Sequence, residues 1–224
     1  MFVLVVDGSP AGTAFAIGSA HVITAYHNLY DDGNKGVLLS LSLTKEVIKR
    51  GETLLISDAI KVKIVLFDED LDWAILEIED RSQSFPERLC LADESELNLA
   101  SMSPMVLHAP IGLFLKGPTD VLHIWKSRPS DVQQFDGSGL RIMCEGSLHS
   151  GSSGSPYVLP ESGKVLAMHL GSIHQSIQVN KRTRLTTEKI LKHLTEQSEV
   201  HASAREGLVL CRVPKIVDFV NKIS

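Results

Sequence analysis

The sequence predicts an all-β fold, because short apolar runs separated by turn residues occupy most of its length. Most of these runs are of strand length and contain β-branched or aromatic residues, which favour extended backbone. Many short strands at fairly regular spacing are typical of β-sandwiches and β-barrels. The runs span residues 2–6, 13–17, 21–25, 37–43, 53–56, 73–78, 105–108, 113–115, 121–125, 140–144, 157–159, 165–170 and 208–213.

A polar segment separates these runs into two sets and marks an expected domain boundary. Residues 92–104 contain several acidic and serine residues and end in Pro104, a composition typical of linkers. The length of 224 residues fits one large or two small domains. We therefore expect an N-terminal domain over residues 1–98 and a C-terminal domain over residues 104–224.

Two helices are expected in the last part of the chain. The first lies in an insert over residues 187–206, where apolar residues recur at helical spacing. The second spans residues 214–224 and begins at Pro214, a residue suited to the first helical position. Its apolar stripe consists of Ile216, Phe219, Val220 and Ile223.

The charge balance argues against nucleic-acid binding. The chain has 22 Lys and Arg residues against 27 Asp and Glu residues, for a net charge of −5. Contacts to phosphates need clustered cations, which this composition does not provide. No apolar run approaches the length of a membrane span, and the first residues lack the basic region of a signal peptide.

The three cysteines, Cys90, Cys144 and Cys211, are too few and too widely spaced for a disulfide framework or a zinc site. Each lies in an apolar run, where cysteine behaves as a small buried hydrophobe. We therefore expect a protein with no metal and no organic cofactor. A reducing compartment fits this cysteine usage, so we expect an intracellular location, cytoplasmic or nuclear, rather than secretion.

The segment Gly-Ser-Ser-Gly-Ser-Pro at residues 151–156 contains the residues that a serine nucleophile needs. Acyl transfer by serine requires a hydroxyl on a tight turn whose backbone N–H groups face the developing oxyanion. Glycine at positions 151 and 154 permits the unusual backbone angles and close approach of such a turn. Ser153 is the candidate nucleophile, and a simple Ser/Gly-rich turn is the alternative.

Two other segments place residues suited to proton transfer at the ends of apolar strands. His27 follows the run 22–25, and histidine takes and returns a proton near neutral pH. Asp72 leads directly into the run 73–76, where a buried carboxylate could orient a histidine. Asp70 is an alternative orienting residue. A surface histidine and a solvated acidic turn are the simpler explanations of these two motifs.

These motifs resemble those of trypsin-like serine endopeptidases, with His27, Asp72 and Ser153 in the order of that family. Residues 12–15 resemble its Gly-Thr-(Gly/Ala)-Phe strand, and residues 24–27 resemble Thr-Ala-x-His. The other matches are to Asp-(Leu/Ile)-Ala-(Leu/Val)-Leu and Gly-x-Ser-Gly-(Gly/Ser)-Pro.

The resemblance covers nearly the whole chain outside the insert. It implies two six-stranded antiparallel Greek-key barrels of the chymotrypsin-like kind, closed by the C-terminal helix. It also implies that a polypeptide substrate is hydrolysed through an acyl-enzyme. The backbone amides of Gly151 and Ser153 would form the oxyanion hole.

The strand after the nucleophile resembles the Gly-(Ile/Met)-His-x-Gly strand of bacterial glutamyl endopeptidases and viral 3C-type peptidases. By this resemblance His169 contacts a Glu or Gln side chain at P1. The alternative is a core histidine bonded to a backbone carbonyl. The expected substrate-binding residues are Ser147, Leu148, His169, Leu170, Gly171 and Ser172.

The P1 preference is expected to be non-tryptic. Position 147, where trypsin-type enzymes have an aspartate, is Ser147, and an unpaired Lys or Arg side chain would be costly to bury there. Leu148 replaces the threonine that usually shares the P1 contact with the histidine. The sequence therefore leaves Glu or Gln and apolar or aromatic P1 residues as alternatives.

Two non-enzymatic functions also stay open. A catalytically silent member of the same fold would act as a protein-binding module. A β-barrel interaction domain would use the Ser/Gly run only as a loop, and Ser153 would then lie far from His27. A protein partner or a homo-oligomer is compatible with either function.

Overall fold

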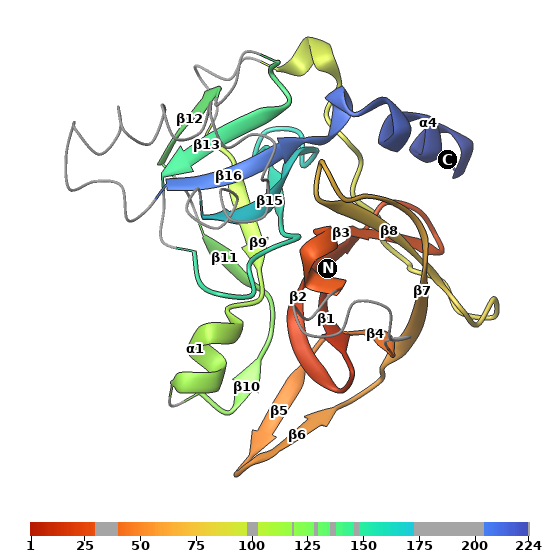
Figure 1. Cartoon of the computed structure of the whole chain (residues 1–224), viewed down its shortest axis with the longest axis vertical. Coiled ribbons are helices and arrows are strands. Elements are labelled where there is room, and N and C mark those ends of the chain that lie inside the picture. The colour runs from red at the N-terminus through yellow and green to blue at the C-terminus, as the bar shows by residue number, and fades with distance from the viewer. Residues whose placement is uncertain are drawn as a thin grey trace.

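The computed structural model consists mainly of β-sheets with few helices, so the predicted all-β class is confirmed (Figure 1). The structure describes residues 1–29, 40–97, 103–117, 119–127, 130–134, 138–145, 148–172 and 204–223. All structural statements below concern these residues.

The first set of strands closes into a six-stranded antiparallel barrel, as the sequence predicts for the N-terminal domain. In barrel order the strands are β1 (Phe2–Val6), β2 (Ser9–Ala16), β3 (His21–Thr24), β8 (Trp73–Ile78), β7 (Ile60–Asp68) and β4 (Leu41–Thr44). Alternate residues of these strands point inward, so Leu4, Val22 and Leu76 are fully buried.

A small sheet of three strands lies against this barrel. It contains β10 (Val121–Leu122), β5 (Val47–Arg50) and β6 (Thr53–Ile56) in that order. Its inner face packs Val47 and Leu122 against Val3 and Val5 of β1. The strand β10 thus joins the second half of the chain to the first.

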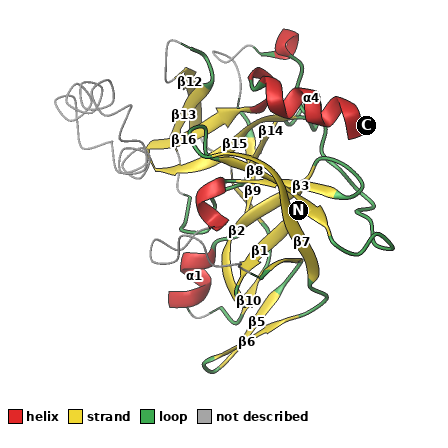
Figure 2. Ribbon diagram, turned by 45° about the vertical axis from the view of Figure 1, so that its right-hand side comes forward, coloured by secondary structure: helices red, strands yellow, loops and turns green. Residues whose placement is uncertain are grey.

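The second set of strands forms a seven-stranded sheet (Figure 2). In sheet order these are β11 (Trp125–Ser127), β9 (Met105–His108), β14 (Pro156–Val158), β15 (Val165–Ser172), β16 (Ala204–Val209), β13 (Arg141–Glu145) and β12 (Ser130–Gln134). The edge strand β12 has no apolar run, which is why the sequence did not predict it.

Helices account for two differences from the sequence prediction. The run 113–115, expected as a strand, lies in helix α1 (Ile111–Lys116), because Ile111 and Phe114 recur at helical spacing and are both buried. The helical insert expected over 187–206 is wrong at its end, since residues 204–206 pair with β13 as part of β16. Residues 187–203 lie outside the described part of the chain.

The C-terminal helix α4 (Pro214–Ile223) confirms the predicted helix over 214–224, with its last residue outside the description. Its Ile216 is fully buried in a cluster that also contains Phe15 and Trp73 of the first barrel and Met168 of the second sheet. The helix therefore seals the junction between the two halves. Short 3-10 helices are η1 (Tyr26–Leu29), η2 (Glu94–Glu96) and η5 (Leu210–Arg212).

The predicted boundary between domains, residues 98–104, lies mostly outside the described residues. The chain already contacts the second sheet before this point, because Leu91 forms a bridge with Val165. The division at residues 98 and 104 therefore stays a prediction.

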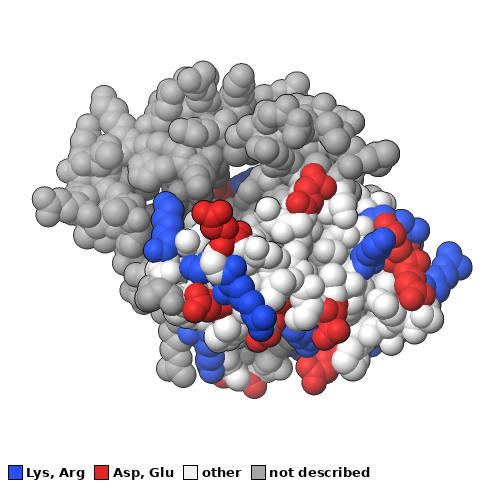
Figure 3. All heavy atoms as spheres, turned by 90° about the horizontal axis from the view of Figure 1, so that it is seen from below, with Lys and Arg blue, Asp and Glu red and all other residues white. Residues whose placement is uncertain are grey.

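The surface carries charges of both signs. Figure 3 shows Lys and Arg side chains next to Asp and Glu side chains on one face of the molecule. Among the described residues, no helix has the length and apolar character needed to cross a membrane.

Candidate active site

The candidate nucleophile Ser153 lies in a tight loop that leads into β14. Gly154 has a φ of +84°, and a Cβ atom there would lie 2.0 Å from the carbonyl oxygen of Thr13. Gly151 has a φ of +92°, and a Cβ atom there would overlap the side chain of Ile111. Only glycine fits these two positions, because positive φ and close approach each exclude larger residues.

Thr13 of β2 holds this loop against the first barrel. Its amide donates to the carbonyl oxygen of Ser153 at 2.9 Å, and its hydroxyl donates to that of Gly151 at 3.0 Å. The same hydroxyl accepts the Ala109 amide at 3.0 Å, and the Thr13 carbonyl accepts the Thr24 hydroxyl at 2.8 Å. One residue thus fixes the backbone on both sides of the nucleophile.

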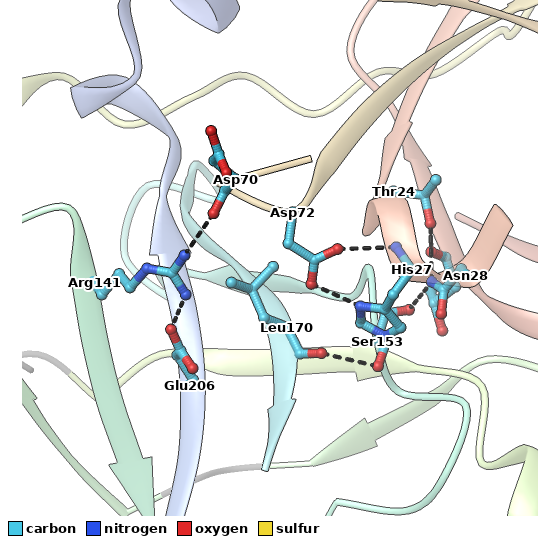
Figure 4. A network of polar contacts seen from close by, with 10 residues as sticks. Thr24, His27, Asn28, Asp70, Asp72, Arg141, Ser153, Leu170 and Glu206 are labelled. Carbon is cyan, nitrogen blue, oxygen red and sulfur yellow. Dashed lines mark hydrogen bonds and ion pairs between the residues drawn. The ribbon is translucent and has the colours of Figure 1, made fainter. Parts of the chain in front are cut away.

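Asn28 joins the same loop to the segment that carries the candidate base (Figure 4). Its Nδ2 donates to the carbonyl oxygen of Ser153 at 2.9 Å and to the hydroxyl of Thr24 at 3.1 Å. Asn28 follows His27 directly in the 3-10 helix η1. The histidine segment and the nucleophile loop are therefore in contact.

His27 is held by Asp72 through two hydrogen bonds (Figure 4). The Nδ1 atom of its ring lies 2.6 Å from Asp72 Oδ2, and its backbone amide donates to Asp72 Oδ1 at 2.9 Å. Asp72 has a φ of +61°, an unusual value for a residue other than glycine. Because an ionised carboxylate only accepts, the pair favours a proton on Nδ1 and leaves Nε2 for another partner.

The alternative orienting residue, Asp70, contacts Arg141. Its backbone carbonyl accepts Arg141 Nη2 at 3.5 Å, and Arg141 also forms an ion pair with the buried Glu206. Figure 4 shows this group beside the His27–Asp72 pair. The carboxylate that contacts His27 is therefore that of Asp72.

The Ser153 hydroxyl donates to the carbonyl oxygen of Leu170 at 3.1 Å. Within the described part of the chain it makes no hydrogen bond to His27. A rotation about the Cα–Cβ bond of Ser153 would change the direction of the hydroxyl between staggered positions. In enzymes without bound substrate the catalytic hydrogen bonds are often long or misaligned.

The amides of Gly151 and Ser153 have no hydrogen-bond partner among the described residues. The carbonyl that precedes each of them is fixed, however. The Ser150 carbonyl accepts the Gly112 amide at 2.9 Å, and the Ser152 carbonyl accepts an amide three residues later at 3.1 Å. Since N–H and C=O point in opposite directions in a trans peptide, both free amides face away from these partners.

A serine–histidine contact lies next to the candidate nucleophile. The Ser152 hydroxyl lies 2.8 Å from His108 Nδ1, and His108 Nε2 lies 2.8 Å from the Ser127 hydroxyl. Ser152 and His108 are buried, so neither can reach a substrate. Burial lowers the pKa of His108 to about 4, with a smaller contribution from His149. This neutral chain of hydrogen bonds anchors the loop.

His169 is buried beneath the nucleophile loop. Its Nδ1 lies 3.0 Å from the hydroxyl of Tyr157. Burial, together with the nearby charges of Arg205, His27 and His108, lowers the pKa of His169 to about 3. The ring is therefore neutral near pH 7, and its role in P1 binding stays a prediction.

The other predicted substrate-binding residues differ in burial and in their distance from Ser153 along the chain. Leu148 and Leu170 are buried, and Leu170 contacts the Ser153 hydroxyl through its carbonyl. Gly171 and Ser172 continue strand β15 beside β16. Ser147 lies outside the described residues. Among the described residues, no group of three or more His, Cys, Asp or Glu side chains could hold a metal ion.

Sequence reasoning missed four residues of the site: Thr13, Asn28, His108 and Arg205. Thr13 lies within a recognised motif and Asn28 directly follows one, but neither motif indicates that these side chains hold the loop of Ser153. His108 has no motif around it, so no local signal in the sequence marks it. Arg205 fell within the expected helical insert, where its place beside β15 was not predictable.

Comparisons with known proteins identify the family and the fold. A family model described as the trypsin-like peptidase domain matches residues 12–168. No curated protein sequence matches the chain.

Two solved structures illustrate the shared fold. One is a Glu endopeptidase in complex with MPD, with a TM-score of 0.59 and 12% identity, covering 94% of this chain and 84% of that one. The other is the active form of the Rv3671c protease from M. tuberculosis, with a TM-score of 0.52 and 17% identity, covering 95% and 73%. At these identities the similarity concerns the fold alone.

Replacing Thr13 by valine should destabilise the protein by about 1–3 kcal/mol, because the carbonyl of Gly151 and the amide of Ala109 would lose a buried partner. Thr13→Ser keeps the hydroxyl and is the matched control. Urea unfolding of both variants measures the difference. A Thr13→Val variant as stable as the wild type would contradict this role of the hydroxyl.

Acidification should destabilise the fold through His108 and His169. Both have folded pKa values below the unfolded value of about 6.5, so their contribution is full above that pH and is lost as the pH falls toward about 4 and 3. Each histidine should contribute a slope on the order of 1.4 kcal/mol per pH unit in its range. Urea unfolding from pH 8 to 4 tests this, and His108→Asn should reduce the slope. A flat profile would contradict it.

Proposed function

The chain belongs to the trypsin-like peptidase family, and from this we propose that it is a serine endopeptidase with Ser153 as nucleophile, His27 as general base and Asp72 as orienting residue. The observation that supports the proposal most is the contact of 2.6 Å between His27 Nδ1 and the Asp72 carboxylate, beside a loop tied to the same segment by Asn28. The residues come from three distant parts of the sequence.

In the proposed reaction, the Ser153 hydroxyl rotates toward His27 and attacks the carbonyl carbon of the scissile peptide bond. His27 Nε2 takes the hydroxyl proton, and Asp72 stabilises the resulting imidazolium. The amides of Gly151 and Ser153 donate to the oxyanion of the tetrahedral intermediate. The proton then moves from His27 to the leaving amine as the C–N bond breaks and the acyl-enzyme forms.

Deacylation repeats these steps with water as the nucleophile. His27 takes a proton from the water, which attacks the ester carbonyl of the acyl-enzyme. The C–O bond to Ser153 breaks, and its oxygen recovers the proton from His27. The new carboxyl terminus leaves, and no metal or cofactor takes part in the proposal.

The substrate is proposed to be a polypeptide with a non-tryptic P1 residue, either Glu or Gln or an apolar side chain. A Glu endopeptidase among the structures with this fold supports the first alternative. A half-buried cation, Arg205, beside His169 disfavours Lys and Arg further. Apolar side chains stay possible because Leu148 and Leu170 are close to the loop.

A second candidate function is that of a silent protein-binding module. The observation that favours it is the hydroxyl of Ser153, which contacts Leu170 rather than His27. Reactivity separates the two functions, because only an activated serine reacts readily with a fluorophosphonate.

Ser153→Ala should lower kcat by at least about 10³-fold, because nucleophile and base act as one unit. Cleavage of a peptide library and fluorophosphonate labelling are the measurements, and Ser152→Ala is the neighbouring control that retains the nucleophile. Labelling of the wild type that persists in Ser153→Ala would contradict the assignment.

Asp72→Asn should lower kcat by on the order of 10³- to 10⁴-fold near neutral pH, because the amide cannot stabilise the imidazolium and favours the wrong tautomer. Asp70→Asn is the matched control and should leave kcat within a fewfold of wild type. A larger loss of kcat for Asp70→Asn than for Asp72→Asn would mean that Asp70 is the orienting residue.

A peptide panel that varies only P1 should give poor cleavage after Lys and Arg, because no carboxylate among the described residues lies in place to pair with them. The measurement is kcat/KM for each peptide. A preference for Lys or Arg would contradict the non-tryptic site.

A further inference from the structure

Arg205 of β16 contacts the chain on both sides of the candidate nucleophile. Its backbone pairs with Ser172, two residues beyond Leu170, whose carbonyl accepts the Ser153 hydroxyl. Its Nη2 donates to the carbonyl oxygen of Leu148, five residues before Ser153, at 2.9 Å. From strand spacings, the Cα atoms of Arg205 and Leu170 are roughly 8 Å apart. An extended side chain of Arg205 can therefore reach a group bound next to Ser153.

The guanidinium of Arg205 is only partly satisfied by the protein. Its Nε is buried without a hydrogen-bond partner among the described residues. No described carboxylate forms an ion pair with it. A cation withdrawn from water without a counter-ion is costly, and a guanidinium matches a carboxylate in a planar, bidentate pair. The arrangement fits an anionic ligand.

The acidic neighbour of Arg205 cannot serve as this counter-ion. Alternate residues of a strand point to opposite faces, so Arg205 and Gly207 share one face of β16 while Glu206 lies on the other, in its own ion pair. Gly207 is opposite His169, and a Cβ atom on it would lie 3.0 Å from the ring of Tyr157. Arg205 therefore shares a face with the His169–Tyr157 pair.

The His169–Tyr157 pair is polar but uncharged near pH 7. Burial lowers the pKa of His169 to about 3 and raises the pKa of Tyr157 well above its usual value. Arg205 is the cation whose charge acts most strongly on His169. Around this part of the nucleophile loop, the fixed positive charge comes from Arg205 and not from His169.

We propose that Arg205 determines specificity by binding the carboxylate of an acidic P1 side chain, so that cleavage follows Asp or Glu in preference to Gln, Leu or Lys. This inference rests on the proposed peptidase function, which it deepens by naming the substrate class. His169 then forms a neutral polar wall of the P1 site. The carboxylate would accept from the guanidinium, whose Nε has no partner among the described residues.

The first test measures kcat/KM for peptides that differ only at P1. The wild type should prefer Glu or Asp over Gln by about 10- to 100-fold. Arg205→Gln should bring the Glu/Gln ratio near 1, and Arg205→Lys should keep part of the preference. Lys164→Gln removes a positive charge at the other end of β15 and should leave the ratio unchanged. A wild-type ratio near 1 would overturn the inference.

The pH dependence of the same ratio separates Arg205 from His169. With Arg205 as the cation, the Glu/Gln ratio should stay constant from pH 6 to pH 9, because arginine keeps its charge throughout. With a histidine as the cation, the ratio would fall by about tenfold per pH unit above the histidine pKa. A falling ratio would overturn the assignment, and this test needs no variant that has to fold.

A binding experiment distinguishes failure of this inference from failure of the proposed function. Product peptides that end in Glu or in Gln are titrated calorimetrically into Ser153→Ala and into Ser153→Ala with Arg205→Gln. Tighter binding of the Glu peptide, lost in the double variant, supports Arg205 even if no cleavage occurs. Equal binding overturns it, even where fluorophosphonate labelling of Ser153 upholds the peptidase function.

Discussion

The hydrogen bonds of Thr13 are the constraint on which the geometry of the site depends. Its amide, hydroxyl and carbonyl engage backbone or side-chain groups from three other segments. Buried polar groups that lose a partner are costly, so a shift of the nucleophile loop would break several bonds at once. Gly154 lies directly against the Thr13 carbonyl, so the loop cannot move closer to β2. The loop of Ser153 therefore belongs to the first barrel as much as to the second sheet.

Uncharged side chains support this loop from inside the second sheet. His108 bonds to Ser152, and His169 bonds to Tyr157, with both rings buried and neutral near pH 7. Burying ions would cost more than burying hydroxyl–imidazole pairs, because the charged forms lose their hydration. Other ionisable side chains near the loop are partly exposed. The imidazole of His27 is 34% exposed, and Arg205 is also partly exposed.

The sequence predicted the features that depend on local order, and the catalytic roles of His27, Asp72 and Ser153 stay predictions. Strand-length runs predicted the all-β class, and His27, Asp72 and Ser153 each followed from a short motif at a strand end or turn. The contacts of Asn28, His108 and Arg205 depend on which strands become neighbours. Strand pairing is set by long-range packing, so no local pattern placed Arg205 beside Ser172. The prediction for residues 113–115 failed for another reason, since a short apolar run fits a helix as well as a strand.

The Ser153 hydroxyl is held less firmly than the backbone and the imidazole around it. The backbone of the loop is held by Thr13, Asn28 and the two glycines, and the imidazole is held by Asp72. The hydroxyl is bound by a single hydrogen bond to the Leu170 carbonyl. Exchanging one hydrogen bond for another across a staggered rotation costs little compared with moving a clamped loop. The amides proposed for the oxyanion hole therefore belong to a clamped loop, and the side chain that the proposed reaction has to move is the one that the described residues hold least.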